Sequence, residues 1–227
     1  MAFVDSDDWI KKDSLGDVYR EAVRFRADIV MGEMEFGHAN GSMDYYKPVP
    51  KEMMYTTYTG KEAFIQFMKT GSYRPMTCNY IYRRAFLEEI QARFMVDITI
   101  HEDELWTPVV LCQASRMVII DTGYYYYRQR DESAVYVTNT KRHINYYIFV
   151  TNLLFGFTDR YDYTGADAEL KSWMYVNVLN RLQYTFSLFS KTKDTSYIMP
   201  SHQLDRYRKE CSEMPPEPQK KCDYYYR

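Results

Sequence analysis

The spacing of apolar and polar positions predicts a layered α/β arrangement for the first half of the chain. A short apolar run at residues 2–4 predicts a buried strand, and it ends in an acidic turn at residues 5–8. Apolar residues at helical spacing then predict a helix over residues 15–26, and residues 28–31 a second strand. Strand, helix and strand in this order are typical of a right-handed crossover between parallel strands.

The middle of the chain has a less regular pattern of apolar and polar residues and predicts shorter elements. Residues 37–60 are rich in Gly, Asn, Pro and Tyr and are expected to form one long loop, a kind that is often functional. Apolar spacing predicts a short helix over residues 61–68, a second within residues 77–94 and a third ending near residue 114. Residues 117–121 and 124–128 are expected to be two short strands joined by a turn at Thr122 and Gly123.

The pattern changes from about residue 140. Residues 144–157 and 169–189 predict two helices with apolar faces, and nothing after them is typical of a strand. A helical appendage over residues 139–213, packed on the sheet domain, is therefore expected. The Pro-rich and charged end, residues 214–227, is expected to be a mobile tail.

Composition narrows the class of protein. Apolar residues make up 46% of the chain and charged residues 26%, as in soluble globular proteins. The net charge of −2 lacks the basic excess of a nucleic-acid-binding protein, so no nucleic-acid partner is expected. No apolar run reaches the length of about 20 residues that spans a bilayer, and no signal peptide is recognised, so a cytoplasmic location is expected. The four cysteines lack CxxC spacing and are expected to be reduced thiols.

The acidic turn is the first candidate for chemistry. It holds Asp5, Asp7 and Asp8 directly after the apolar run, and ligands of open α/β sheets bind at the carboxyl ends of strands. Carboxylates crowded in this way suit Mg²⁺ or Mn²⁺ bound together with a substrate diphosphate. The alternative is that these acids only cap the following helix. A calcium loop is excluded, because the positions that need Gly and Glu hold Ile10 and Gly16.

A second acidic cluster at residues 102–104 strengthens the first. A carboxylate at the start of a helix is stabilised by the helix dipole and can act as a general base towards an acceptor hydroxyl. A metal–diphosphate site and a base on the opposite face are the two functions that sugar transfer from a nucleotide donor needs. Direct displacement of this kind inverts the anomeric centre.

Three segments carry a resemblance to a known family. Residues 3–9 resemble the Asp-x-Asp strand end of family 2 glycosyltransferases with the GT-A fold, and residues 101–104 resemble that family's Glu-Asp base motif. Residues 125–130, with Ser133 after them, resemble the Tyr-x-Tyr-Arg segment that closes the catalytic domain in many bacterial members. The order and separations agree over about residues 1–136. The resemblance implies an α/β fold: a partial, Rossmann-like GT-A sheet domain (residues 1–138, its C-terminal portion) followed by the helical appendage.

The resemblance also implies roles on the donor side. Asp7 would be the principal ligand of Mg²⁺ or Mn²⁺, and Asp5 would contact the metal or the nucleotide ribose. Asp8 would support the turn beside the diphosphate. Arg128 and Arg130 would offer positive charge to that diphosphate. Arg128 could instead pair with a structural acid.

On the acceptor side, Asp103 would be the catalytic base, and Glu102 would orient donor or acceptor. His101 and Trp106 would contact the acceptor. Two alternatives without a role in catalysis or binding stay open here. Glu102 and Glu104 could be first-turn charges only, and His101 could be a packed, hydrogen-bonded residue.

The sequence departs from the family at its front. Members begin with a strand carrying a Pro-Val-Tyr-Asn-like motif and further βα units that bind the nucleotide base, on the order of 80 residues that do not occur here. Residues 2–4 would then lie at an uncovered sheet edge, which predicts a homodimer or a completing chain.

The expected function is inverting, metal-dependent transfer of a sugar from a nucleotide-diphosphate donor to a glycan or lipid-linked acceptor. This transfer would serve polysaccharide biosynthesis. The protein could also associate peripherally with the inner face of the membrane. This chain alone would form an incomplete enzyme. One alternative is a non-catalytic remnant that binds sugars or a partner. A plain helical interaction module is another.

Overall fold

The computed structural model describes residues 1–37, 43–45, 48–96, 98, 100–129, 141–161, 163, 167–192, 209 and 212–225. The chain divides into two compact units. The first, called the sheet unit here, holds Met1–Met95 and Trp106–Ser133; the second, the helical unit, holds Val96–Leu105 and Ala134–Arg227. The segment that carries the second acidic cluster thus belongs with the C-terminal helices.

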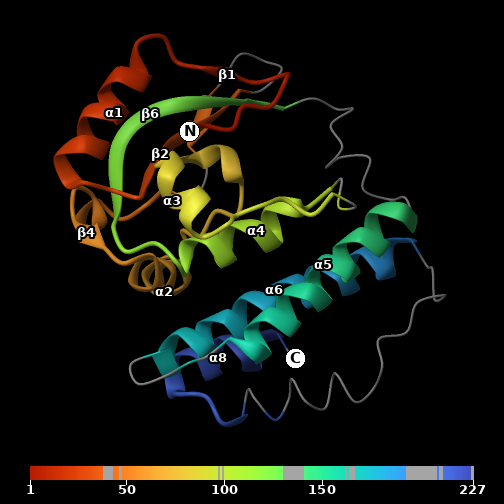
Figure 1. Ribbon diagram of the computed structural model, residues 1–227. Helices are drawn as coiled ribbons and strands as arrows, with labels where there is room; N and C mark the ends of the chain where they lie inside the picture. Colours follow the sequence, from red (N-terminus) through yellow and green to blue (C-terminus); the bar gives the residue numbers. More distant parts are fainter. Residues whose placement is uncertain are drawn as a thin grey trace. The chain divides into compact units, whose positions relative to one another are not determined.

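Two long strands form the centre of the sheet unit. β2 (Ile29–Gly37) and β6 (Met117–Arg128) pair in parallel along their whole length, with an irregularity in register around Glu33 (Figure 1). Four short strands add to them, all antiparallel: β1 (Trp9–Ile10) and β4 (Thr57–Tyr58) on β6, and β3 (Met43–Tyr45) and β5 (Tyr80–Tyr82) on β2. The result is a mixed, curved α/β sheet, which confirms the predicted class.

The core lies between this sheet and α1 (Ser14–Phe25). Val18 of α1 is buried against Val30 and Met34 of β2 and against Val118 and Ile120 of β6. Burying aliphatic side chains of this size stabilises the fold by about 1.5–3 kcal/mol each. The helix is amphipathic, as its sequence predicts, and stops where Arg26 takes a left-handed conformation whose N–H caps the last carbonyls.

The helix predicted over residues 61–68 is confirmed as α2 (Gly60–Thr70). Thr59 begins it with a capping box: its hydroxyl accepts a hydrogen bond from the Glu62 N–H, and the Glu62 carboxylate accepts one from the Thr59 N–H. Gly71 ends it at φ 72°, a conformation that favours glycine.

Several sequence-based expectations for the sheet unit are wrong. Residues 2–4 do not form a strand, because only Ala2 makes a bridge, to Ile81. The expected loop at residues 37–60 contains β3, the 3₁₀ turn η1 (Lys51–Met53) and β4. The expected helix within residues 77–94 is replaced by η2 (Thr77–Asn79), β5 and the short α3 (Arg84–Glu89).

The two strands expected at residues 117–128 are one continuous strand, β6. Gly123 lies opposite Glu33 in the ladder and continues the strand instead of turning it. A Cβ at this position would lie 2.7 Å from a carboxylate oxygen of Glu35, so the glycine admits a neighbouring side chain.

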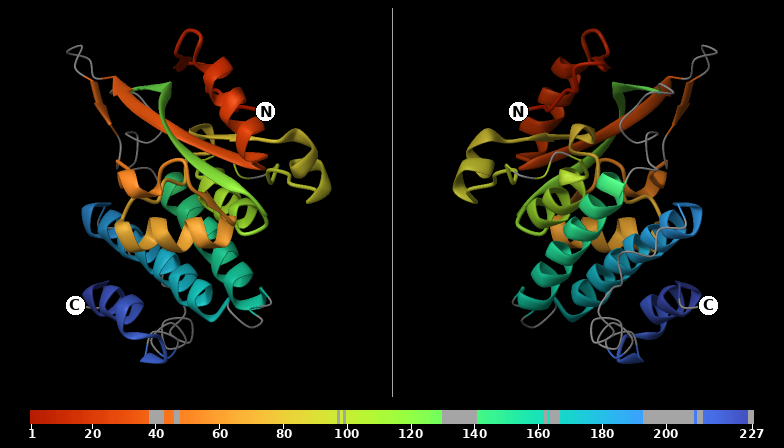
Figure 2. Two further views of the ribbon diagram at one scale, coloured as in Figure 1. Left: turned by 90° about the vertical axis from the view of Figure 1, so that its left-hand side faces the viewer. Right: turned by 90° about the vertical axis from the view of Figure 1, so that its right-hand side faces the viewer.

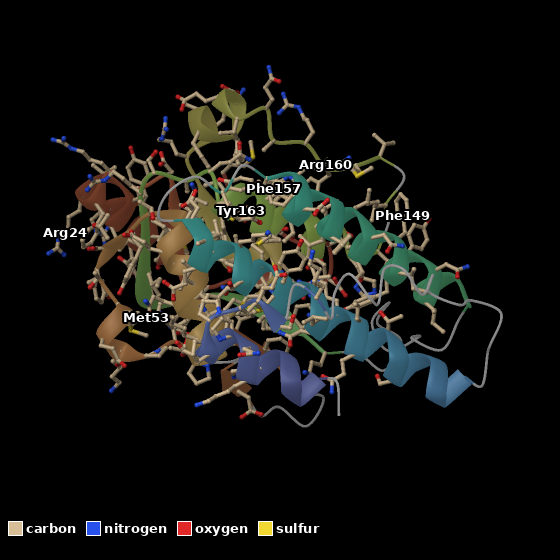
Figure 3. The ribbon with its side chains drawn as sticks, turned by 90° about the horizontal axis from the view of Figure 1, so that it is seen from below. Arg24, Met53, Phe149, Phe157, Arg160 and Tyr163 are labelled. Carbon is tan, nitrogen blue, oxygen red and sulfur yellow. The ribbon has the colours of Figure 1, made fainter. Side chains whose placement is uncertain are left out.

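The helical unit is built on α5 (Lys141–Arg160) and α6 (Ala168–Thr192), which pack side by side (Figure 2). Both were predicted, and both are longer than expected. Leu154 and Trp173 are fully buried, whereas Phe149 projects outward from α5 and is 45% exposed (Figure 3). The Pro-rich end, expected to be a mobile tail, carries α8 (Pro216–Tyr225), with proline at its first position.

One further helix, α4 (Glu102–Leu111), carries the second acidic cluster in its first turn. Its first residues belong to the helical unit and those from Trp106 onward to the sheet unit. Across the described residues, no helix combines the length and the apolar character that crossing a membrane requires.

Candidate functional site

The acidic turn is fastened to the end of β6. The turn is closed by a hydrogen bond from the Asp8 N–H to the Asp5 carbonyl at 3.2 Å. The Asp8 carboxylate accepts hydrogen bonds from the Tyr125 hydroxyl at 2.7 Å and from the Arg128 N–H at 2.9 Å. The Tyr125 hydroxyl in turn accepts one from the Asp5 N–H at 3.1 Å. Two of the three motifs, far apart in sequence, therefore meet at one place in the sheet unit.

Asp8 has a supporting role in this arrangement. Both of its carboxylate oxygens accept hydrogen bonds from β6, so Asp8 holds the turn on this strand. Burial raises the pKa of Asp8 above its ordinary value, and the hydrogen bonds from Arg128 and Tyr125 oppose this rise only in part.

Asp5 and Asp7 are the carboxylates of the turn that suit a cation. Asp5 is exposed and Asp7 half-buried. Within the described part of the chain, no group of three or more His, Cys, Asp or Glu side chains could hold a metal. A pair of carboxylates is still a fitting donor set for Mg²⁺ or Mn²⁺, since these ions use one or two carboxylates and complete their shell with water and substrate phosphates.

An aromatic stack lies beside the turn. The Trp9 ring stacks on the ring of Tyr126, its partner in the β1–β6 ladder, at 5.5 Å between centroids. The Arg128 guanidinium lies over the Trp9 ring at 5.0 Å, a favourable cation–π position. Arg128 thus brings a positive charge next to the acidic turn. Arg130, the other predicted donor contact, lies outside the described residues.

Trp9 and Tyr126 were not singled out from the sequence. The signal that could have found them is the aromatic residue directly after the acids, together with a run of tyrosines on a later strand. Aromatic pairs across antiparallel strands stabilise each other, so such a pairing was open to prediction.

The second acidic cluster begins α4 in the helical unit. His101 precedes it in a left-handed conformation, φ 64°, and its carbonyl accepts a hydrogen bond from the Glu104 N–H at 3.1 Å. Its ring lies edge-on to Tyr147 of α5, at 4.6 Å and 88°. Glu104 forms an ion pair with Arg181 of α6. The His101 ring thus contacts α5, and the Glu104 carboxylate contacts α6.

Asp103 has an unusual environment for a carboxylate. It is half-buried, and burial is the largest cause that raises its pKa, to about 8; the nearby charges of Glu104 and Glu102 raise it further. The charge of Arg181 and a hydrogen bond from the Glu104 N–H act in the opposite direction. A carboxyl group with a pKa near neutrality suits proton transfer.

Arg181 and Tyr147 are the functional candidates that sequence reasoning missed. Arg181 is the one charged residue in the sequence between Lys171 and Lys191, and a buried arginine needs a carboxylate partner. This need for a partner was a signal in the sequence that Arg181 pairs with an acid. It does not identify the acid, because the partner comes from a distant part of the sequence.

Trp106 does not occupy the position expected of an acceptor contact. It is 7% exposed. Its ring stacks on Phe94 at 4.7 Å and meets Phe3 and Tyr82 edge-on. In the sheet unit it is therefore a core residue, because aromatic side chains of the unit itself surround the ring.

Other arginines make structural ion pairs. Arg74, fully buried, pairs with Glu33 at 2.8 Å and donates to the Asn79 side chain at 3.3 Å. Arg83 binds the buried Asp28 through two donors, at 2.8 and 3.0 Å. These pairs fix the backbone around β2 and β5.

The chain shares sequence similarity with a glycosyltransferase. No protein-family profile matches the chain. Glycosyltransferase GlyA of Streptococcus pneumoniae serotype 4 is 22% identical over 134 residues, which cover 59% of this chain and 19% of GlyA. The chain thus spans about a fifth of the length of this relative.

Among solved structures, S. aureus TarS 1–349 in complex with UDP-GlcNAc gives a TM-score of 0.48 at 18% identity, over 82% of this chain and 59% of that chain. S. aureus TarS gives 0.43 at 19% identity, over 92% of this chain and 39% of that chain. Over a little more than half of its length, the chain is similar in sequence to a glycosyltransferase.

Proposed function

We propose that this chain forms part of an inverting glycosyltransferase. It would transfer a sugar from a nucleotide-diphosphate donor to a hydroxyl of a glycan or lipid-linked acceptor, as in polysaccharide biosynthesis. The observation that carries the proposal is the pair of hydrogen bonds between the acidic turn and β6, in which the Asp8 carboxylate accepts from Tyr125 and Arg128. Sequence similarity to GlyA supports the same class of reaction.

The donor side is assigned to the sheet unit. Asp7 and Asp5 would hold Mg²⁺ or Mn²⁺, and Arg128 would lie against the diphosphate. When bound, such an ion offsets the negative charge that develops on the departing diphosphate. Asp8 keeps the turn at the end of β6, so that both carboxylates and the guanidinium are presented together.

The acceptor side is assigned to the start of α4. The acceptor hydroxyl oxygen forms a bond to the anomeric carbon, and the bond from that carbon to the diphosphate oxygen breaks. The hydroxyl proton passes to the Asp103 carboxylate, with Glu102 and His101 orienting the acceptor. Attack opposite the leaving group inverts the anomeric centre. Only ionised Asp103 can accept the proton, so the rate should rise with pH up to about its raised pKa of 8.

Calorimetric titration of UDP with Mn²⁺ tests the donor side. The unsubstituted chain should give a binding heat, and Asp7→Asn should abolish it. Asp13→Asn is the matched control, because it neutralises an exposed acid at the start of α1 and suits the left-handed conformation there. Equal binding by Asp7→Asn and the unsubstituted chain would contradict the assignment of the acidic turn.

The competing function is a binding module without catalysis. It is separated by adding a radiolabelled nucleotide sugar and testing for transfer or hydrolysis. Binding that needs Asp7 but no turnover by the unsubstituted chain would favour the binding module. Asp103→Asn should keep the binding heat and lose turnover if the catalytic proposal is right.

A further inference from the structure

We infer that Arg181 and Tyr147, from α6 and α5, are positioning residues for the acceptor-side base at the start of α4. The C-terminal helices would then be part of the acceptor machinery of this protein. This inference rests on the proposed function for the role of Asp103 as a base. The contacts that carry it lie entirely within the helical unit.

The first observation is the ion pair of Arg181 with Glu104. Arg181 is 5% exposed, and the Glu104 side chain is 14% exposed. Burying a guanidinium is costly unless a carboxylate compensates it. The pair therefore ties the first turn of α4 to the middle of α6.

The second observation is the set of contacts that the Tyr147 side chain makes. Tyr147 is 6% exposed, lies edge-on to the His101 ring and is hydrogen-bonded to Arg181. The ring of Tyr184 of α6 also contacts the Tyr147 ring, with 5.0 Å between centroids. One tyrosine thus contacts both the residue before the acidic cluster and the arginine that pairs with it. His101, in a backbone conformation that is uncommon outside glycine, is held in place by this contact.

The third observation is the balance of charge around Asp103. Glu102 and Glu104 disfavour its ionised form, as does burial, and Arg181 favours it. Tyr147 and Tyr184 face Glu104, and His101 lies at the same turn. Without Arg181, the charges of Glu104 and Glu102 would act on Asp103 without the positive charge that opposes them. The pKa of Asp103 should then rise, and fewer molecules would hold the base in its working form at neutral pH.

A purely structural ion pair makes a different prediction. It would change the stability of the helical unit and leave the titration of Asp103 where it is. The two readings are therefore separated by measuring the Asp103 pKa itself. That measurement is independent of any transferase activity.

The experiment is a carboxyl ¹³C NMR titration of the full chain. Arg181→Lys keeps the charge and should leave the Asp103 pKa close to its original value. Arg181→Gln keeps a donor for Glu104 without the charge and should raise that pKa by about one unit or more. Arg160→Gln, an exposed arginine of α5 in the same unit (Figure 3), is the matched control and should change nothing. An unchanged Asp103 pKa in Arg181→Gln would overturn the inference.

A second comparison covers the case in which Arg181→Gln does not fold. Glu104→Gln and the double variant Arg181→Gln with Glu104→Gln differ only in the arginine. In Glu104→Gln the arginine keeps Asp103 as a neighbouring acid, and in the double variant neither member of the pair is charged. The Asp103 pKa should be higher in the double variant, and equal values would overturn the inference. If the chain transfers sugar, the pH–rate profile should move by the same amount with the donor KM unchanged. A chain that shows the NMR shift but no transfer contradicts the proposed function and leaves the link between Arg181 and Asp103 standing.

Discussion

At the residue scale, one hydroxyl holds the acidic turn on the sheet. The Asp8 carboxylate accepts hydrogen bonds from the Tyr125 hydroxyl and from the Arg128 N–H, one at each of its two oxygens. The same hydroxyl also accepts the Asp5 N–H, so one tyrosine fixes both ends of the turn.

Tyr125→Phe should therefore damage the turn while keeping the ring. We expect a loss of about 1–2 kcal/mol in the free energy of unfolding, because one buried hydroxyl serves two hydrogen bonds. Urea denaturation measures it. Tyr126→Phe keeps the stack on Trp9 and should cost less than about 0.5 kcal/mol. Equal losses in the two variants would show that the hydroxyl of Tyr125 contributes nothing special.

Asp103 supplies a prediction on pH. Its folded-state pKa is raised, so between about 4 and about 8 the folded chain keeps a proton that the unfolded chain has released. Stability from this group therefore falls as pH rises through that window. Asp103→Asn should remove this loss of stability with rising pH. At pH 8 its free energy of unfolding should exceed that of the original chain by at least about 1.4 kcal/mol, the equivalent of one pKa unit.

Urea denaturation at pH 5 and pH 8 checks this prediction. Asp17→Asn, which neutralises an exposed acid of α1, should keep the pH dependence of the original chain. If Asp103→Asn and the original chain lose stability in parallel between the two pH values, the carboxyl group is not perturbed in the way described.

At the scale of single elements, caps and pairings decide where each helix and strand begins. α2 starts at the Thr59 capping box. Thr59→Ala should cost about 1 kcal/mol, because an N–H of the first turn loses its acceptor. Faster amide hydrogen exchange in the first turn of α2 would report it. Thr56→Ala, an exposed threonine just before β4, should leave that exchange unchanged.

Sequence periodicity predicted α1, α2, α5 and α6, because each has an apolar stripe at helical spacing. It failed at β5, where Tyr80 and Tyr82 alternate inwards and pair with β2. The same residues also fit a helical stripe through Ile81, and tertiary pairing decided between the two patterns. It failed again at Gly123, which is typical of a turn in sequence but opposes Glu33 in the ladder.

The site was predictable to a similar degree. The sequence singled out the acidic turn and residues 125–130, and the structure joins Asp8 of the turn to Tyr125 and Arg128. The sequence did not show that Asp8 would bond to Tyr125, since hydrogen bonds between distant segments follow from the fold. The identity of the carboxylate that pairs with Arg181 could not be predicted for the same reason. Trp106 was expected to contact the acceptor because an aromatic residue beside acids fits a core and an acceptor site equally well.

At the scale of the whole molecule, the proposed function gives the donor to the sheet unit. Mn²⁺ is paramagnetic, so its binding together with UDP should broaden the NMR signals of residues 5–8. In Asp7→Asn this broadening should vanish. Unchanged signals of the acidic turn when Mn²⁺ and UDP are added to the unsubstituted chain would contradict the assignment.

The parallel pairing of β2 with β6 has a consequence for biosynthesis. All residues from Met43 to Arg116 lie between these two partners in the chain, so the central ladder is a pairing of high contact order. A nascent chain on the ribosome can form α1 early, but β2 has to wait for its principal neighbour until Arg128 has been synthesised. Chaperone engagement with the unpaired edge of β2 should accordingly end once β6 has emerged.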